Sequence, residues 1–246
     1  MSWRILHSKV TESTNRDALL GKPGDVFTAE LQTAGRGRLD HKWLSPAGEN
    51  LIMSAVIDVS DISPQEIATL PLVAGLSAAE AISAVFAARG ADSVCSGVKL
   101  KWPNDIHVAG RKICGILCER NGDFVIVGMG VNVNQTVFDP EISNHATSMR
   151  LEIDAVLDIG HVRDTVLDFL AENIELWRQD GFRSLLPRLE EFDCLKGRNV
   201  TVKRTDDDCE PACGICRGIR PDGMLDVDGE AISAGEAHIM SAYTEM

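Results

Sequence analysis

The stretch from Phe124 to Asn134 constrains the fold more than any other part of the chain, because its residues alternate in character without a break. Successive side chains of a strand point to opposite faces of a sheet, so this stretch predicts a strand with two different faces. One face would carry Val125, Val127, Met129, Val131 and Val133. The opposite face would carry Phe124, Ile126, Gly128, Gly130, Asn132 and Asn134.

The second face has the composition of a ligand site. Glycine weakens a strand and often marks a place where a ligand or another backbone comes close. Asparagine donates and accepts hydrogen bonds at once, as the edge of an adenine requires. Periodicity alone is equally compatible with the solvent-exposed face of a sheet.

Strands and helices alternate around this stretch, which predicts an α/β (α+β) fold. Leu51 to Val59 is apolar on both faces, as in a strand at the middle of a covered sheet. Helical spacing runs from Leu72 to Phe86 and from Val162 to Trp177, where Asn173 is the one polar residue on the apolar face. Other expected features are a capped helix after Ser13, strands at 3–10 and 26–32, a hairpin of 105–108 with 112–119, and a break near Gly181 and Pro187.

The C-terminal part changes to short strand-like segments separated by turn signals. These segments are 199–204, 214–219, 224–227 and 231–239. They predict a small β-barrel that starts near Cys194. We therefore expect a larger α/β domain over residues 1–190 and a smaller β-domain over residues 194–246.

Composition limits the partners and the compartment. The 246 residues carry a net charge of -13, which argues against general affinity for nucleic acid, because phosphates attract clustered cations. No apolar run has the length of a signal peptide or a membrane span, so we expect a cytoplasmic protein without DNA or a membrane as partner. Seven cysteines, an odd number, predict reduced thiols.

Cys209, Cys213 and Cys216 have the spacing of a radical enzyme's iron–sulfur motif. They fall inside the small β-domain, which is too short for the barrel that such chemistry requires. Only Cys194 or His238 could complete a zinc site with them. We expect no metal site here, and the role of the three cysteines stays open.

Two further stretches carry reactive side chains. Gly35-Arg36-Gly37-Arg38 combines glycines, which let a backbone approach an anion, with guanidinium groups that bind carboxylate or phosphate oxygens. It is neither a P-loop nor a dinucleotide fingerprint, and a solvated turn is the alternative. Lys101 to Asp105, followed by Lys112, offers a mobile positive charge and a base, the alternatives being an edge-strand lysine and a packed tryptophan.

Together these stretches form an ordered set that resembles the biotin protein ligase family over nearly the whole chain. The set comprises Ser13-Thr14-Asn15, Gln32 to Arg38, Trp43 to Pro46, Gly48 to Leu51, Lys101 to Asp105, Lys112 to Leu117, Gly128 to Asn134, Ala146 to Ser148, Leu195 to Gly197, Gly218-Ile219 and Ser233 to Glu236. The resemblance implies a mixed sheet with helices similar to class II aminoacyl-tRNA synthetases, followed by an SH3-like C-terminal barrel. It makes residues 1–190 the domain that binds biotin and ATP.

The resemblance also implies a two-step ligase. The carboxylate of biotin attacks the α-phosphate of ATP, which Mg2+ accompanies, and gives biotinyl-5'-AMP and pyrophosphate. A lysine of a biotin carboxyl carrier domain then takes the biotinyl group. Relatives include monomers and homodimers, so the oligomeric state and the native acceptor stay open.

The family's site residues fall on residues of the quoted motifs. Biotin would be bound by Ser13, Thr14, Asn15, Gln32, Gly35, Arg36, Gly37, Arg38, Lys112 and Gly115. The nucleotide would be bound by Arg36, Arg38, Trp43, Asn104, Lys112 and Asn132. The catalytic residues would be Arg38, Lys112 and Asp105, with Asp105 accepting a proton from the incoming lysine amine.

The chain departs from the family in two places. Relatives often continue the loop after Arg38 with glycine and arginine, whereas Leu39-Asp40-His41 places a negative charge there, with an open effect on loop closure. Some relatives carry an N-terminal DNA-binding module, and the few residues before Ser13 predict a form without it.

Two rival functions remain. A lipoate or octanoate ligase or transferase would share the α/β core, and a non-catalytic biotin sensor would keep the binding residues. The arginine loop and the C-terminal barrel favour biotin. The combined presence of Arg36, Arg38 and Lys112 favours retained chemistry, because a sensor need not neutralise a transferring phosphate.

Overall fold

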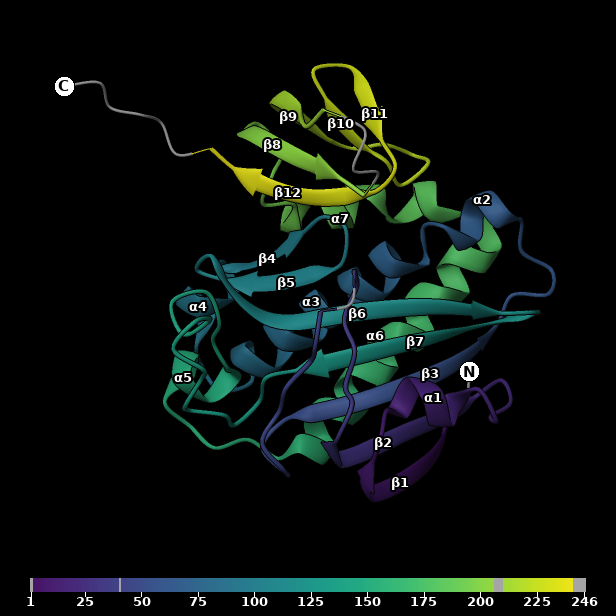
Figure 1. The fold of residues 1–246 in the computed structure, drawn as a ribbon, viewed down its shortest axis with the longest axis vertical. Coiled ribbons are helices and arrows are strands. Elements are labelled where there is room, and N and C mark those ends of the chain that lie inside the picture. Colours follow the sequence, from purple (N-terminus) through teal and green to yellow (C-terminus); the bar gives the residue numbers. More distant parts are fainter. Residues whose placement is uncertain (1, 40, 206–209, 241–246) are drawn as a thin grey trace.

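A seven-stranded sheet forms the centre of the protein, as seen in a computed structural model that describes residues 2–39, 41–205 and 210–240 (Figure 1). The strand order is β1-β2-β3-β7-β6-β5-β4, with β1 and β2 parallel and the other neighbours antiparallel. The strands are β1 (Arg4–Thr11), β2 (Asp25–Gln32), β3 (Leu51–Asp58), β4 (Val98–Lys101), β5 (Asp105–Val108), β6 (Arg111–Asn121) and β7 (Phe124–Val131). These bounds confirm the predicted strands and the predicted hairpin.

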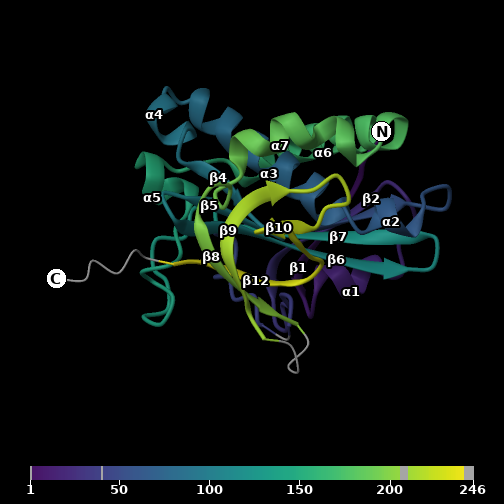
Figure 2. The same cartoon turned by 90° about the horizontal axis from the view of Figure 1, so that it is seen from above.

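Two long helices, α3 (Leu70–Ala87) and α6 (Ile159–Asp180), cover one face of this sheet, and α1 (Thr14–Ala18) lies on the other (Figures 1 and 2). Both long helices were predicted. Asn173 of α6 is fully buried between them and donates from Nδ2 to Ser77 Oγ at 3.0 Å and to Glu80 Oε2 at 2.8 Å. The shorter helices are α2 (Pro64–Ile67), α4 (Asp92–Cys95), α5 (Met149–Ile153), α7 (Leu186–Phe192) and the 3-10 helix η1 (Phe182–Leu185).

The helical stretch Pro64–Ala87 is long and apolar enough to cross a membrane by length and composition, with a mean hydropathy of 1.7. Within the fold, 72% of the 18-residue apolar window of this stretch is buried. Because α3 packs between the sheet and α6, its apolar character is that of a core helix.

Strand β7 explains the alternating pattern that predicted it. Val125, Val127, Met129 and Val131 belong to the main core. The strand ends at Val131 rather than at Asn134, because the carbonyls of Asn132 and Val133 accept hydrogen bonds from the backbone N–H groups of Met149 and Arg150 instead of from a neighbouring strand.

The C-terminal segment forms a second, five-stranded antiparallel sheet, in the order β11-β10-β9-β8-β12. This sheet is consistent with the predicted SH3-like domain. Its strands are β8 (Asn199–Arg204), β9 (Ala212–Ile219), β10 (Leu225–Val227), β11 (Glu230–Ile232) and β12 (Gly235–Ile239). The segment predicted as one strand over 231–239 is two, since β11 pairs with β10 whereas β12 crosses to pair with β8.

The break predicted near Gly181 and Pro187 is only half right. Gly181 ends α6 with a φ of 73°. Pro187 does not break a helix, because it occupies the first turn of α7, where a missing N–H is no loss. The helical chain therefore continues to Phe192.

Two hydrogen bonds connect the two sheets beside β4. Trp102 Nε1 donates to the carbonyl of Gly223 at 3.1 Å, and the backbone N–H of Cys194 donates to the carbonyl of Leu100 at 3.1 Å. Trp102 is buried, as its interpretation as a packed aromatic predicts. The smaller sheet is thus held next to the stretch Lys101 to Asp105.

Candidate active site

A cleft of about 300 Å³ is lined by residues of α1 and of the sheet face on which α1 lies. Its walls come from α1, the segment 32–43, strands β6 and β7, and strand β12 of the smaller sheet. The predicted site residues that line it are Ser13, Thr14, Asn15, Gln32, Arg36, Gly37, Arg38, Trp43, Asn104, Asp105, Lys112 and Gly115. Two predicted residues, Gly35 and Asn132, are not part of this lining.

One end of the cleft is a neutral hydrogen-bonding floor. Gln32 Oε1 accepts from the backbone N–H of Thr14 at 2.8 Å and from its hydroxyl at 3.0 Å. Ser54 Oγ lies 2.7 Å from Thr14 Oγ1 and 2.6 Å from Asn15 Oδ1. Ser54 is fully buried in an otherwise apolar strand, and sequence reasoning missed it. A lone serine in the apolar run of β3 was the available signal.

The glycines of β7 make room for side chains that lie flat on the sheet. A Cβ on Gly128 would come 2.1 Å from Asn15 Oδ1, and a Cβ on Gly130 would come 2.3 Å from the indole of Trp43. On β6, a Cβ on Gly115 would come 3.1 Å from the same indole. The glycine face of the predicted strand is therefore the floor of a site rather than a solvent face.

The arginine loop folds back on itself at the mouth of the cleft. The backbone N–H of Gly37 donates to the carbonyl of His41 at 2.7 Å, and that of Trp43 donates to Gly35 at 3.0 Å. Gly35 is required because a Cβ there would come 2.4 Å from the carbonyl oxygen of Trp43. Asp40, the unexplained charge of this loop, lies outside the described residues.

Both arginines of the loop are anchored through a single nitrogen. Arg36 Nη2 donates to Glu119 at 2.7 and 2.9 Å, and Arg38 Nη1 donates to Asn104 Oδ1 at 3.1 Å. Burial lowers the pKa of the Arg38 guanidinium, and the charges of Asp105 and Glu236 oppose that shift. Since arginine has five N–H donors, each side chain keeps donors for an anionic ligand.

Lys112 and Asp105 form an ion pair at the same end, with Nζ 2.7 Å from Oδ1. The pair is brought together by the β5–β6 hairpin, whose register shifts between Ile106 and His107. Lys112 Nζ also lies 5.8 Å from the centroid of the Trp43 ring. The arrangement can neutralise an anion with Lys112 and accept a proton with Asp105.

The smaller sheet supplies another wall of the cleft, next to the arginine loop. Glu236, Ala237 and His238 of β12 line the cleft, and Glu236 Oε1 lies 3.5 Å from His41 Nε2. Sequence reasoning did not assign these residues to the site, because their position depends on how the two sheets pack.

Comparison with known proteins places this geometry in a family. The model described as the biotin/lipoate A/B protein ligase family matches residues 7–134. The bifunctional ligase/repressor BirA of Escherichia coli is 32% identical over 246 residues, which covers 95% of this chain and 73% of BirA. The chain belongs to the biotin/lipoate A/B protein ligase family.

Other relatives agree with this assignment over most of the ligase. The biotin--[acetyl-CoA-carboxylase] ligase of Mycobacterium tuberculosis is 33% identical over 245 residues, covering 95% of this chain and 88% of that relative. The structure of the Aquifex aeolicus biotin protein ligase in complex with biotin and ATP superposes with a TM-score of 0.84 at 27% identity, covering 97% and 99% of the two chains. The chain is therefore a ligase enzyme, as the resemblance implied.

In this ligase Asn132 lies behind the cleft rather than in it. It is 5% exposed, its Nδ2 donates to the carbonyl of Thr147 at 3.0 Å, and its own carbonyl accepts from Met149. Here its side chain fixes the turn into α5. Its predicted contact with the nucleotide stays a prediction, because this bond uses only one of the two N–H donors of the Asn132 amide.

The cysteines of the ligase are mostly shielded thiols. Burial raises the pKa of Cys114 and Cys118 to about 12, and that of Cys194 and Cys216 to about 11. Among the described residues no group of three or more His, Cys, Asp or Glu side chains could hold a metal ion. Cys209 lies outside those residues. Thiols with raised pKa values are poor nucleophiles at neutral pH.

Proposed function

We propose that this ligase activates biotin with ATP as biotinyl-5'-AMP and transfers the biotinyl group to a lysine of a biotin carboxyl carrier domain. The observation that carries the proposal is one cleft that combines a neutral polar floor with three cationic side chains, those of Arg36, Arg38 and Lys112. Biotin has the matching form, since its ureido head group is neutral and its tail ends in a carboxylate. The relatives named as biotin ligases support the same substrate.

In the first step a biotin carboxylate oxygen attacks the α-phosphorus of ATP. A bond forms between this carboxylate oxygen and the α-phosphorus. The bond from the α-phosphorus to the oxygen that bridges it to the β-phosphorus breaks, and pyrophosphate leaves with that oxygen. The reactants are both anions, so Arg36, Arg38 and Lys112 lower the barrier by neutralising their charge and holding them in line. Trp43, at the cationic end, is the expected platform for the nucleotide.

In the second step the carrier's lysine amine attacks the acyl carbon of the adenylate. An amide bond forms, the acyl carbon–oxygen bond breaks, and AMP leaves with the electron pair. Asp105 accepts the proton that the amine loses. Magnesium would enter with ATP as part of the substrate. Asp105, as a cleft carboxylate, suits an ion that keeps most of its water.

One assay tests the proposal. The purified chain is mixed with Mg-ATP, labelled biotin and a biotin carboxyl carrier domain, and label on the carrier is measured. We expect labelled carrier only with ATP present. Biotin binding without transfer would establish the sensor function, and transfer of lipoate instead of biotin would establish the lipoate ligase.

A further inference from the structure

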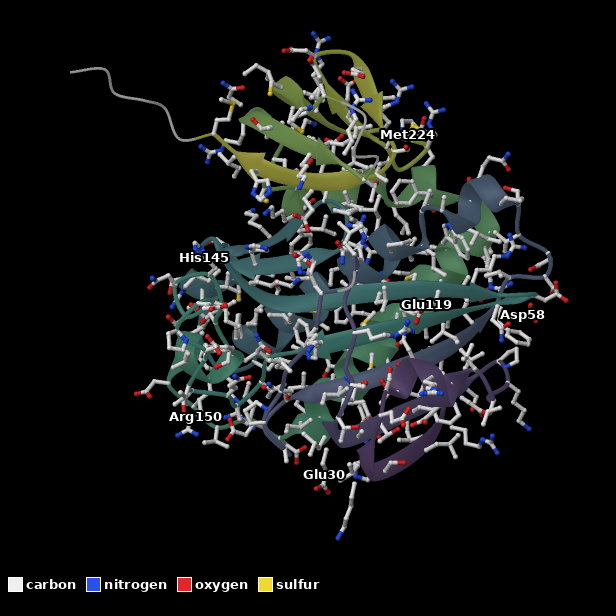
Figure 3. All side chains as sticks on the ribbon, in the orientation of Figure 1. Glu30, Asp58, Glu119, His145, Arg150 and Met224 are labelled. Atoms are coloured by element: carbon white, nitrogen blue, oxygen red, sulfur yellow. The ribbon has the colours of Figure 1, made fainter. Side chains whose placement is uncertain are left out.

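Glu119 is a charged residue that the proposed reaction does not use, yet it contacts two residues of the site. It follows Gly115 and Leu117 on β6 at a spacing of two, so its side chain points to their face of the sheet. Gly115 and Leu117 line the cleft. Figure 3 shows Glu119 on this face, between β6 and α1. Its side chain is 33% exposed.

The Glu119 carboxylate joins a residue of the polar floor to the arginine loop. It accepts from Arg36 Nη2 with both oxygens, at 2.7 and 2.9 Å, and from Asn15 Nδ2 at 2.7 Å. Among the described residues the Arg36 guanidinium donates only from Nη2, with these two bonds to Glu119, so its Nε and Nη1 donors stay available. Hydrogen bonds to an ionised group are the stronger kind, and they fix geometry.

The same carboxylate helps to decide how the Asn15 amide is turned, together with the backbone carbonyl of Leu117, which accepts from Asn15 Nδ2 at 3.4 Å. A carboxylate only accepts hydrogen bonds, so Asn15 must present its NH2 group to Glu119 and its oxygen to Ser54, 2.6 Å away. Ser54 in turn contacts Thr14, which donates to Gln32. A continuous chain of hydrogen bonds therefore runs from the floor of the cleft to Arg36 through Glu119.

We propose that Glu119 is a positioning residue that sets the orientation of Asn15 and Arg36 together. This inference rests on the proposed function, in which Asn15 contacts the biotin head group and Arg36 the reacting anions. An ionised carboxylate is needed because Oε2 accepts from both partners while Oε1 accepts from Arg36 as well. A glutamine has only one acceptor oxygen, so its NH2 group would lie against Arg36 Nη2, which is also a donor. Glu119 thereby links recognition of the head group to the geometry of the reacting end.

The test is biotin-dependent exchange of labelled pyrophosphate into ATP, with kcat and the KM for biotin measured separately. We expect Glu119→Gln to lower kcat by at least about tenfold through the misplaced Arg36, and to raise the KM for biotin severalfold because a neutral amide oxygen holds Asn15 less strongly than a carboxylate does. In an Arg36→Ala background, Glu119→Gln should lower kcat no further while the KM still rises, because only the Asn15 contact is left to lose.

Glu80 supplies a matched control. Its carboxylate also accepts from an asparagine and an arginine, Asn173 Nδ2 at 2.8 Å and Arg188 Nε at 2.9 Å, in the helical layer away from the cleft. Glu80→Gln should lower the melting temperature yet leave kcat and KM unchanged. Equal kinetic losses in both variants would show that Glu119 acts through stability, and the proposal would then fail.

The other outcomes are equally decisive. The proposal would be overturned if Glu119→Gln kept the wild-type kcat and KM. It would also be overturned if Glu119→Gln lowered kcat by the same factor in the wild-type protein and in the Arg36→Ala variant. The wild-type protein tests the proposed function in the same assay, because the absence of any exchange there removes biotin activation itself and this inference with it. If the wild-type protein exchanges pyrophosphate and Glu119→Gln does so equally well, the proposed function stands and only the inference about Glu119 fails.

Discussion

The ion pair between Lys112 Nζ and Asp105 Oδ1 brings together the side chains proposed for charge neutralisation and proton transfer. The Lys112 side chain is 35% exposed, so its removal leaves the fold little changed. We expect Lys112→Ala to lower pyrophosphate release by at least about 100-fold, because a charge facing the transferring phosphate is lost.

The matched control is Lys203→Ala, which removes an exposed strand lysine of the smaller sheet. It should release pyrophosphate at the wild-type rate, and both variants should melt near the wild-type temperature. Normal pyrophosphate release by Lys112→Ala would exclude Lys112 from the reaction.

Gly130 is the second residue whose role follows from local geometry. A Cβ there would lie 2.3 to 2.6 Å from atoms of the Trp43 indole, so Gly130→Ala must displace that ring. We expect activity to fall by about tenfold or more, with a loss of about 1–3 kcal/mol in the free energy of unfolding. Activity assays and urea denaturation measure the two effects.

A double variant separates this clash from other effects of the added methyl group. If displacement of the ring is the cause, Trp43→Ala/Gly130→Ala should be no less active than Trp43→Ala alone. A further loss in the double variant would mean that Gly130 serves the site by another route.

At the scale of elements, the packing of α6 on α3 fully buries two polar side chains that bond to each other, Asn173 and Ser77. Asn173→Ala removes hydrogen bonds to Ser77 and Glu80 and leaves a small cavity. We expect the free energy of unfolding to drop by about 2–3 kcal/mol, since a hydrogen bond to a charged group is lost. Asp168→Ala, on the exposed side of α6, should change it by less than about 0.5 kcal/mol in urea denaturation. A similar small change for Asn173→Ala would contradict this account.

Elements with strong periodicity could be predicted from the sequence, because their pattern is local. Strand β7 and helices α3 and α6 were expected from spacing alone. The end of an element depends on residues far away in the sequence. For β7, the last predicted residues bond to the start of α5 instead of to a neighbouring strand. Pro187 was read as a break because sequence alone does not distinguish the first turn of a helix from its interior.

The candidate site divides in the same way. Glycine, arginine and lysine motifs identified most of the cleft lining, because those residue types are unusual where they stand. Ser54, Glu119 and Glu236 were missed, since a serine in an apolar strand or an acidic residue in an acidic protein gains meaning only from its partner. Such partners come from other elements and become visible only in the packed structure.

On the scale of the whole molecule, Asp193 occupies the connection between the two sheets. Its Oδ1 accepts from the backbone N–H of Leu195 at 2.8 Å, whereas its Oδ2 is buried without a hydrogen-bond partner among the described residues. Burial raises the pKa of the Asp193 carboxyl above its ordinary value, although hydrogen bonds from Leu195 and Lys196 oppose the shift. The carboxyl is therefore protonated more readily in the folded protein than in the unfolded chain.

A raised carboxyl pKa gives stability that is present at acidic pH and is lost as the pH rises through the raised value. Asp193→Asn keeps the Oδ1 acceptor without the charge. We expect it to melt at a higher temperature than the wild type at pH 7, and to lose that advantage at about pH 4, near the ordinary pKa of aspartate. Thermal unfolding at both pH values measures this, and a lower melting temperature at pH 7 would show that the charge is satisfied.

The cleft is lined by residues as far apart along the chain as Ser13 and His238. A growing chain leaves the ribosome from its N-terminal end, so α1 and the arginine loop exist long before β12 is made. The last wall of the cleft forms only when β12 pairs with β8. A nascent chain of this ligase can therefore complete its cleft only after β12 has emerged.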